Sequence, residues 1–265
     1  MNAVTKKQNT EVAGFDDNEF ADLGPEQSVS REIVIPKILI MQGQSPRVLD
    51  QENNFGELVD TMNWEVLASA SGKNKEAMPL EFTPFHWVKL WINKYQVGDK
   101  WFFHSIDNID HTNEALNPFE EWQGTDREGK PCNMKRVFMH LFYVLVPGKP
   151  LPYTLGFRGS SKKAGDSLMT QMYVANKMLK NVENYMRSPM GAMMQATPVK
   201  KTKDGNTFIE LEIKKLRESS KEEAMEALQW YKTVNAGEAR VDHSDIEQEG
   251  KSEAPQGTVP DDIEF

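Results

Sequence analysis

The stretch FHWVKLWINKY, residues 85–95, constrains the fold of this chain most strongly. Aromatic and β-branched residues dominate it, which is typical of a β-strand. Successive side chains of a strand point to opposite faces. One face would carry His86, Val88, Leu90 and Ile92, which is mostly an ordinary core face. The other would carry Phe85, Trp87, Lys89, Trp91, Asn93 and Tyr95, where four rings alternate with a lysine and an asparagine.

Two interpretations of the ring-rich side remain open. Rings beside polar residues suit a protein that binds single-stranded nucleic acid, because every base has a π-face and each stacked base contributes about 1–3 kcal/mol. Alternatively, this side is a second buried face, as in a sandwich core, because tryptophan is usually well buried.

Other segments also predict strands, and turn residues join several of them into hairpins. Residues 107–131 are rich in Asn, Pro, Gly and charge and predict a long loop. The first expected strand spans 33–41, with Pro36 at an edge or bulge, and a short strand is expected within 63–70. Three pairs of strands follow: 78–95 and 101–107 joined by VGDK, 136–148 and 151–159 joined by PGKP, and 188–201 and 206–216 joined by KDGN.

Two helices are expected after the second hairpin. Apolar residues from Leu168 to Met186 recur at alternating spacings of four and three, which predicts one apolar helix face. Ser160 or Ser161 would cap the start of this helix. A shorter amphipathic helix is expected over 221–234.

Together these elements predict a mainly β (α+β) fold, an OB-fold-like antiparallel β-barrel with one long and one short appended helix. Strands and helices do not alternate, so a parallel α/β fold is disfavoured. Three regions are expected: a disordered acidic segment over 1–30, the barrel domain over 31–234, and a disordered acidic tail over 235–265. The terminal regions have few apolar side chains with which to offset the entropy of ordering.

The net charge of −9 disfavours nucleic acid as a partner only when the chain is averaged as a whole. Residues 1–30 carry two lysines and six acids, and residues 235–265 carry two basic residues and nine acids. Residues 130–187 instead hold ten basic residues and two acidic ones. Such a basic sector is the electrostatic footprint of a nucleic-acid binder, although a solvated surface would have the same composition.

The rings and cations that we expect to bind nucleic acid come from the long strands and the start of the first helix. Lysine and arginine would hold phosphates, and binding would weaken with salt. The base-stacking candidates are Trp87, Trp91, Tyr95, Trp101 and Tyr143, and the phosphate candidates are Lys89, Lys135, Arg136, Lys149, Arg158, Lys162 and Lys163.

No motif points to catalysis, a metal or another cofactor, so we expect a protein that is not an enzyme. FRGSSKKAGD lacks the GK[ST] ending of a phosphate loop, and no HExxH or GxSxG motif occurs. HSIDNIDH, residues 104–111, would make at most a weak metal site, and Cys132 is alone. The first residues lack the apolar region of a secretory signal, and no run approaches about 18 apolar residues, so we expect a soluble cytoplasmic protein.

The last residues, DDIEF, follow an acidic, Pro- and Gly-containing stretch. With the aromatic-basic strands, this ending resembles the single-stranded DNA-binding proteins of bacteria and phages, which have an OB-fold and a disordered acidic tail with an apolar tip. The matching residues are Asp261, Asp262, Ile263 and Phe265, while Glu264 stands where the bacterial proteins have proline. The resemblance implies that the tail binds replication and recombination proteins and competes with DNA for the groove.

We therefore expect a sequence-independent single-stranded DNA-binding protein of phage replication, recombination or repair, acting in the host cytoplasm without membrane contact. A homo-oligomer is compatible with this expectation. The first alternative is a strand-annealing recombination mediator. The second is an acidic interaction or inhibitor protein that mimics DNA and does not bind it, and the third is an enzyme such as a metal-dependent nuclease.

Overall fold

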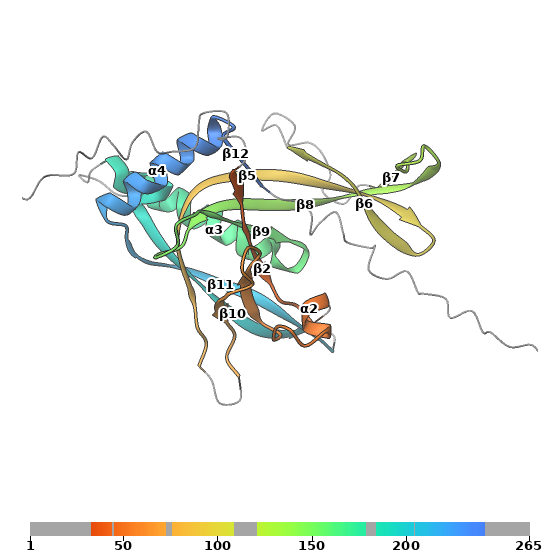
Figure 1. Ribbon diagram of the computed structural model, residues 1–265, viewed down its shortest axis with the longest axis horizontal. Coiled ribbons are helices and arrows are strands. Elements are labelled where there is room, and N and C mark those ends of the chain that lie inside the picture. The colour runs from red at the N-terminus through yellow and green to blue at the C-terminus, as the bar shows by residue number, and fades with distance from the viewer. Residues whose placement is uncertain are drawn as a thin grey trace, which may run out of the picture.

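A strongly curved β-sheet forms the body of the molecule (Figure 1). The computed structural model describes residues 33–43, 45–72, 76–108, 121–178, 184–203 and 205–241. The strands are β1 (Ile33–Ile35), β2 (Lys37–Ile40), β3 (Glu57–Asp60), β4 (Val66–Ser69), β5 (Leu80–Val97), β6 (Lys100–Asn108), β7 (Glu121–Thr125), β8 (Pro131–Leu145), β9 (Tyr153–Arg158), β10 (Ala192–Lys203), β11 (Asn206–Glu218) and β12 (Ala239–Val241). The helices are α2 (Pro46–Leu49), α3 (Lys162–Met178) and α4 (Lys221–Asn235), with 3-10 turns η2 (Gly159–Ser161), η3 (Asn184–Arg187) and η4 (Pro189–Gly191).

The main sheet has the order β11-β10-β5-β8-β9-β2-β3-β4 and curls into a half-barrel, which confirms the expected mainly β, OB-like fold class. β6 pairs with β5, and β7 pairs with β8, outside this path. The pairing is antiparallel except between β2 and β9 and between β1 and β12. Pro36, which has no N–H to donate, separates β1 from β2, and the two strands enter different sheets.

Gln42 links two strands that lie far apart in the sheet order. Its side-chain amide donates to the carbonyl of Ile209 at 3.0 Å and accepts from the backbone N–H of the same residue at 2.9 Å. Ile209 belongs to β11 at one end of the path, whereas Gln42 follows β2 near the other end. The amide therefore satisfies the backbone groups of an edge strand and helps to hold the sheet curled.

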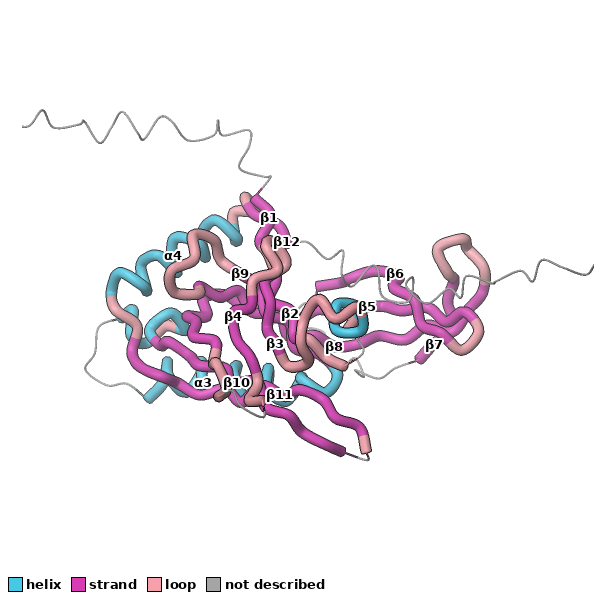
Figure 2. The backbone as a smooth tube through the Cα atoms, turned by 60° about the horizontal axis from the view of Figure 1, so that its bottom comes forward, coloured by secondary structure: helices cyan, strands magenta, loops and turns pink. Residues whose placement is uncertain are grey.

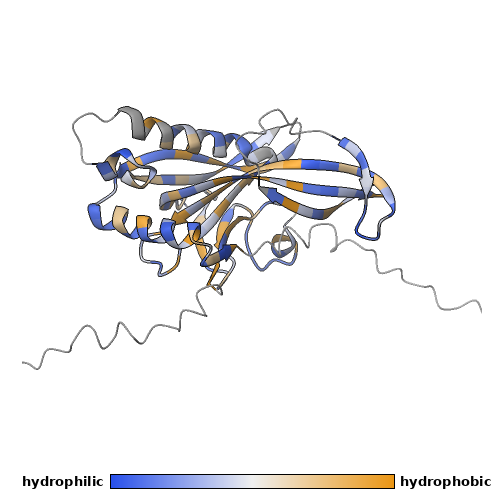
Figure 3. Ribbon diagram, turned by 90° about the horizontal axis from the view of Figure 1, so that it is seen from above, coloured by the Kyte–Doolittle hydropathy of each residue, from blue (hydrophilic) through white to orange (hydrophobic). Residues whose placement is uncertain are grey.

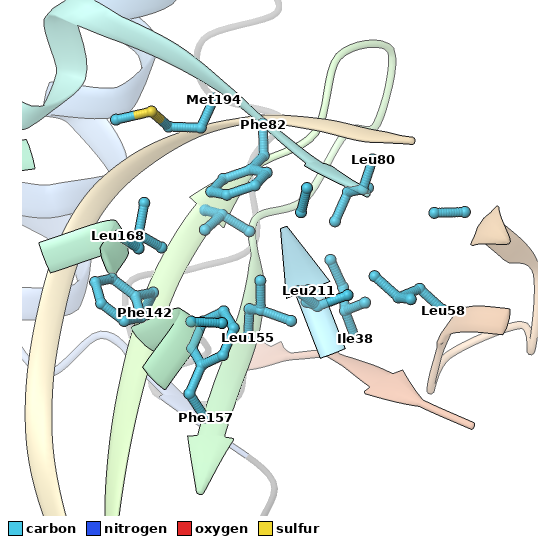
Figure 4. Packing of buried hydrophobic residues seen from close by; sticks show 14 of the residues in the cluster. Ile38, Leu58, Leu80, Phe82, Phe142, Leu155, Phe157, Leu168, Met194 and Leu211 are labelled. Carbon is cyan, nitrogen blue, oxygen red and sulfur yellow. The ribbon is translucent and has the colours of Figure 1, made fainter. Parts of the chain in front are cut away.

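The main core fills the inside of this curl (Figure 4). Phe82, Phe142 and Phe157 are completely buried there, and Leu168 of α3 packs against them. Ile209 and Leu211 of β11 enter the same cluster, and they alternate along the strand with Glu210 and Glu212. In Figure 3 the long strands show the matching bands of hydrophobic and hydrophilic residues.

The helices α3 and α4 cover opposite sides of the sheet (Figure 1). α3 approaches closely at Gly165, where an added Cβ would lie 2.8 Å from Cβ of Phe157 and 3.0 Å from the His140 ring. α4 packs Ala224 and Ala227 on Phe85. A capping box starts α4, because the Ser220 hydroxyl accepts from the N–H of Glu223 and the Glu223 carboxylate accepts from the N–H of Ser220.

The expected hairpins β5–β6, β8–β9 and β10–β11 are confirmed, and both main helices start where predicted. The first helix ends earlier than its pattern suggested: the described part reaches Met178, residues 179–183 lie outside the described chain, and Met186 belongs to η3. Within the described part of the chain, no helix is long and apolar enough to cross a membrane.

Three local expectations differ from the structure. Residues 121–125 were expected in a loop but form β7, which pairs with the start of β8. Phe85 was expected on the ring-rich side, but a register shift between Pro84 and His86 turns it into the cluster under α4. Ala239–Val241, expected in the tail, pair with β1 as β12.

Candidate nucleic-acid interface

β5, β6, β7 and β8 extend beyond the helices as an arm, seen on the right of Figures 1 and 2. We define the arm as β6, β7 and residues 90–97 and 131–139 of β5 and β8, which pair with them. The arm is therefore a ribbon with the strand order β6-β5-β8-β7, and both of its faces can be followed from the register.

Directly opposite residues of paired strands lie on the same side of a sheet. The ring-bearing face carries the pairs Trp87 with Phe142, Lys89 with His140, Trp91 with Phe138, Asn93 with Arg136 and Tyr95 with Met134. The opposite face carries the pairs His86 with Tyr143, Leu90 with Met139, Ile92 with Val137 and Lys94 with Lys135. The alternation predicted for residues 86–95 is thus confirmed.

Contacts between rings run along the ring-bearing face. The centre of the Phe138 ring lies 5.5 Å from that of Trp91 and 4.6 Å from that of His140, in both cases edge to face. Tyr95 stacks on Phe102 of β6 at 5.7 Å. Tyr95, Phe102 and Phe138 are partly exposed, whereas Trp91 is only 7 % exposed. Trp91 therefore supports its neighbours, and the other three present ring surface.

Cations lie beside these rings. The guanidinium carbon of Arg136 lies 5.5 Å from the ring centre of Trp91 and 4.7 Å from that of Trp122 on β7. Nζ of Lys162 is 5.5 Å from the Phe138 ring centre, and Nζ of Lys89 is 5.3 Å from that of Trp87. Cation–π attraction favours these positions, so positive charge and ring surface alternate along the face.

A hydrogen-bonded chain anchors the inner end of the face to α3. Nε1–H of Trp87 donates to Nδ1 of His140 at 3.1 Å, so the other ring nitrogen, Nε2, carries the proton and donates to Asp166 at 2.8 Å. Burial lowers the pKa of His140, which keeps the ring neutral. The second oxygen of Asp166 accepts from Lys162 at 2.8 Å.

Asp166 therefore positions Lys162 next to Phe138. Burial acts to raise the pKa of Asp166, but the hydrogen bonds from Lys162 and His140 together hold this pKa below its usual value. The carboxylate stays ionised and fixes the lysine at the edge of the ring-bearing face.

The opposite face of the arm is also basic. Lys94 and Lys135 are cross-strand partners, and Nζ of Lys135 lies 4.0 Å from the ring centre of Trp101. Burial, followed by repulsion from Arg158, lowers the pKa of Lys94 to about 8. Burial and then the charge of Lys94 lower the pKa of Lys135.

The predicted binding residues therefore divide between several places. Trp87, Lys89, Trp91, Tyr95, Arg136 and Lys162 come together on the ring-bearing face. Trp101, Lys135 and Arg158 share the opposite face. Tyr143 lies on that face too, but under α4, where its ring is 5.2 Å from His86 and burial raises its pKa.

The remaining predicted residues lie elsewhere or outside the described chain. Lys149 lies in the turn after β8 and forms an ion pair with Glu65. Lys163 is exposed on the first turn of α3. The expected tail contacts, Asp261, Asp262, Ile263, Glu264 and Phe265, lie outside the described residues.

The predicted binding residues omit five rings of the ring-bearing face: Phe102, Trp122, Phe138, His140 and the core residue Phe142. Arg136, Phe138, His140 and Phe142 alternate in the same way as the residues of β5, so this period could have revealed Phe138 and His140. Trp122 was hidden within the expected loop, although the turn-forming sequence DREGK follows it. Among the described residues, no three His, Cys, Asp or Glu side chains gather as metal ligands.

Comparison with known proteins adds one finding. The family model described as Pam3 phage gp34-like protein matches residues 5–240. No curated protein and no solved structure matches the chain.

Proposed function

Because this chain belongs to the Pam3 phage gp34-like protein family, we propose that it is a phage protein that binds single-stranded DNA in the cytoplasm of the host. The observation that carries the proposal is the ring-bearing face of the arm, where Tyr95, Phe102, Trp122 and Phe138 alternate with cations. A site for single-stranded DNA needs both ring surface on which bases stack and positive charge for the phosphates.

The geometry gives each group a role in this proposal. Bases stack on the partly exposed rings of Tyr95, Phe102, Trp122 and Phe138. Phosphates meet Lys89, Arg136 and Lys162, each of which already lies beside a ring. Stacking uses the π-face that every base has, so binding is largely independent of sequence.

The protein acts by binding, without catalysis, in replication or recombination of phage DNA. Its acidic C-terminal tail, residues 235–265, recruits replication or recombination proteins.

The test is fluorescence anisotropy of labelled oligo(dT), with the duplex of equal length as competitor. Arg136→Gln removes one charge from the ring-bearing face and should weaken binding about tenfold, which corresponds to ~1.4 kcal/mol. Lys221→Gln removes the same charge from the exposed start of α4 and should leave affinity unchanged.

Equal affinity for single strands and duplex, or no binding at all, would contradict the proposal. Equal losses in Arg136→Gln and Lys221→Gln would show that net charge, not the ring-bearing face, sets affinity.

A further inference from the structure

Asp107 of β6 places a carboxylate on the ring-bearing face, among the groups that would hold phosphates. It is the cross-strand partner of Trp91, which pairs in turn with Phe138, so the three side chains form one row across β6, β5 and β8. Asp107 is exposed. Among the described residues no cation pairs with it, and the one side-chain hydrogen bond it makes is accepted from the amide of Asn93.

A carboxylate at this position opposes phosphate binding, because like charges repel and Lys89, Arg136 and Lys162 lie on the same face. The part of a strand that suits it is therefore a base. An ionised carboxylate only accepts hydrogen bonds, through about four lone-pair positions on its two oxygens. It favours a base edge that donates.

Guanine meets this requirement better than the other three bases. Its Watson–Crick edge presents two adjacent donors, N1–H and the N2 amino group, one for each carboxylate oxygen. Adenine and cytosine each present one amino group next to an acceptor nitrogen, and thymine presents one N–H between two carbonyl oxygens, which a carboxylate repels. Unpaired bases of a single strand expose this edge, and proteins read it by hydrogen bonds.

The row of side chains gives such a base a stacking surface and a fixed acceptor. Phe138 is partly exposed and lies two strands from Asp107, roughly 10 Å away at a strand spacing of ~4.8 Å. A purine, with two fused rings, spans more of this distance than a pyrimidine. Trp91 lies between the two and is only 7 % exposed, so it forms the floor. The buried Asn93 donates to Ser105 Oγ at 2.9 Å as well as to Asp107, which holds the carboxylate in place.

We infer that Asp107 reads guanine: a guanine that stacks on Phe138 donates its N1–H and one N2–H to the two oxygens of Asp107. The inference rests on the proposed function, because the same face binds the strand. Stacking still accommodates every base, so the protein binds any single strand and holds strands that contain guanine more tightly.

The test compares three labelled oligonucleotides of about 12 nucleotides, a length within the ~4–16 nucleotides of an OB-domain site. One is oligo(dT), the second carries single guanines separated by thymines, and the third has inosine in place of each guanine. Inosine keeps N1–H but lacks the N2 amino group. Fluorescence anisotropy measures their affinities for the parent, for Asp107→Asn and for the control Asp99→Asn, which removes the same charge from the exposed turn between β5 and β6.

The parent should bind the guanine oligonucleotide about tenfold more tightly than the inosine one, within the discrimination that a bidentate contact provides. Asp107→Asn should lose this ratio and bind oligo(dT) at least as tightly as the parent, because the repulsion of phosphates is gone. Asp99→Asn should keep the ratio.

Equal affinity of the parent for the guanine and inosine oligonucleotides would overturn the inference while the proposed function stood. An unchanged ratio in Asp107→Asn would overturn it too, because another group would then read guanine. Failure of the parent to bind any of the three would overturn both.

Discussion

Arg136 shows how one side chain can connect supporting and exposed rings. Its guanidinium lies between the buried Trp91 and the partly exposed Trp122. Planar guanidinium groups stack on indoles and still direct N–H donors outward, which an ammonium does less well. Arg136 is therefore suited to meet a phosphate while it keeps Trp122 in place.

Phe138 is the ring whose removal tests stacking with least damage to the charge pattern. Phe138→Leu keeps the apolar character but loses the aromatic face, and should weaken oligo(dT) binding by about 1–3 kcal/mol. Phe208→Leu on β11, also partly exposed, is the matched control and should bind as the parent does. Isothermal titration calorimetry measures both. Parental affinity in Phe138→Leu would contradict a stacking role.

The pKa of Lys94, about 8 against an ordinary value of 10.5, predicts a pH effect on stability. At neutral pH the partly buried charge opposes folding. Between about pH 8 and 10.5 the folded protein releases this proton while the unfolded chain keeps it, so the parent gains stability as the pH rises. Lys94→Gln lacks this gain.

Urea unfolding of both proteins at pH 7 and pH 10 measures the difference. We expect the free energy of unfolding of Lys94→Gln, relative to that of the parent, to be higher at pH 7 than at pH 10. A difference that does not change with pH would contradict the shifted pKa.

Among the elements, α3 limits how far the ring-bearing face extends. Leu168 and Met172 bury the inner parts of β8 and β9, while Lys162 marks where the rings become accessible. α3 can approach the sheet this closely because Gly165 has no side chain. The position of the helix, and with it the hydrogen bonds from Trp87 through His140 to Asp166, therefore depends on this glycine.

Gly165→Ala should destabilise the protein, because its Cβ would overlap Phe157 and His140, and overpacking typically costs 1–3 kcal/mol. Thr170→Ala, at an exposed position of the same helix, should change stability by less than about 0.5 kcal/mol. Denaturant unfolding measures both. Higher stability of Gly165→Ala would show that α3 does not lie this close.

α4 provides a contrasting prediction, because it packs on the other side of the sheet from α3. Ser220→Ala removes the capping hydroxyl and should cost about 0.5–2 kcal/mol of stability. Affinity for oligo(dT) should not change, since α4 contributes no residue to the ring-bearing face. A large loss of affinity in the folded variant would place part of the binding surface on α4.

The strands and their alternation could be predicted because period and turn residues are local properties. The division of the cations between the two faces could not be predicted, because it depends on the register in which β8 pairs with β5 and β9 pairs with β8. Arg136 of β8 pairs with Asn93 on the ring-bearing face, whereas Arg158 of β9 pairs with Met139 on the opposite face. Phe85 shows the same limit, because one register shift moved it to the cluster under α4.

In the molecule as a whole, the half-barrel contains the hydrophobic core, and the arm carries the surfaces that suit single-stranded DNA. The ring-bearing face and the opposite face give the arm rings and cations on both sides, while the helices cover the sheet away from it (Figure 2). The basic sector expected from composition is thus only partly on the arm, since Lys149 pairs with Glu65 elsewhere.

Ultraviolet cross-linking of oligo(dT), followed by mass spectrometry of the adducts, tests the central claim most directly. The account predicts adducts on peptides that contain Tyr95, Phe102, Trp122 or Phe138, and their loss when unlabelled oligo(dT) competes. Adducts confined to β10 and β11, or to peptides outside the arm, would contradict it.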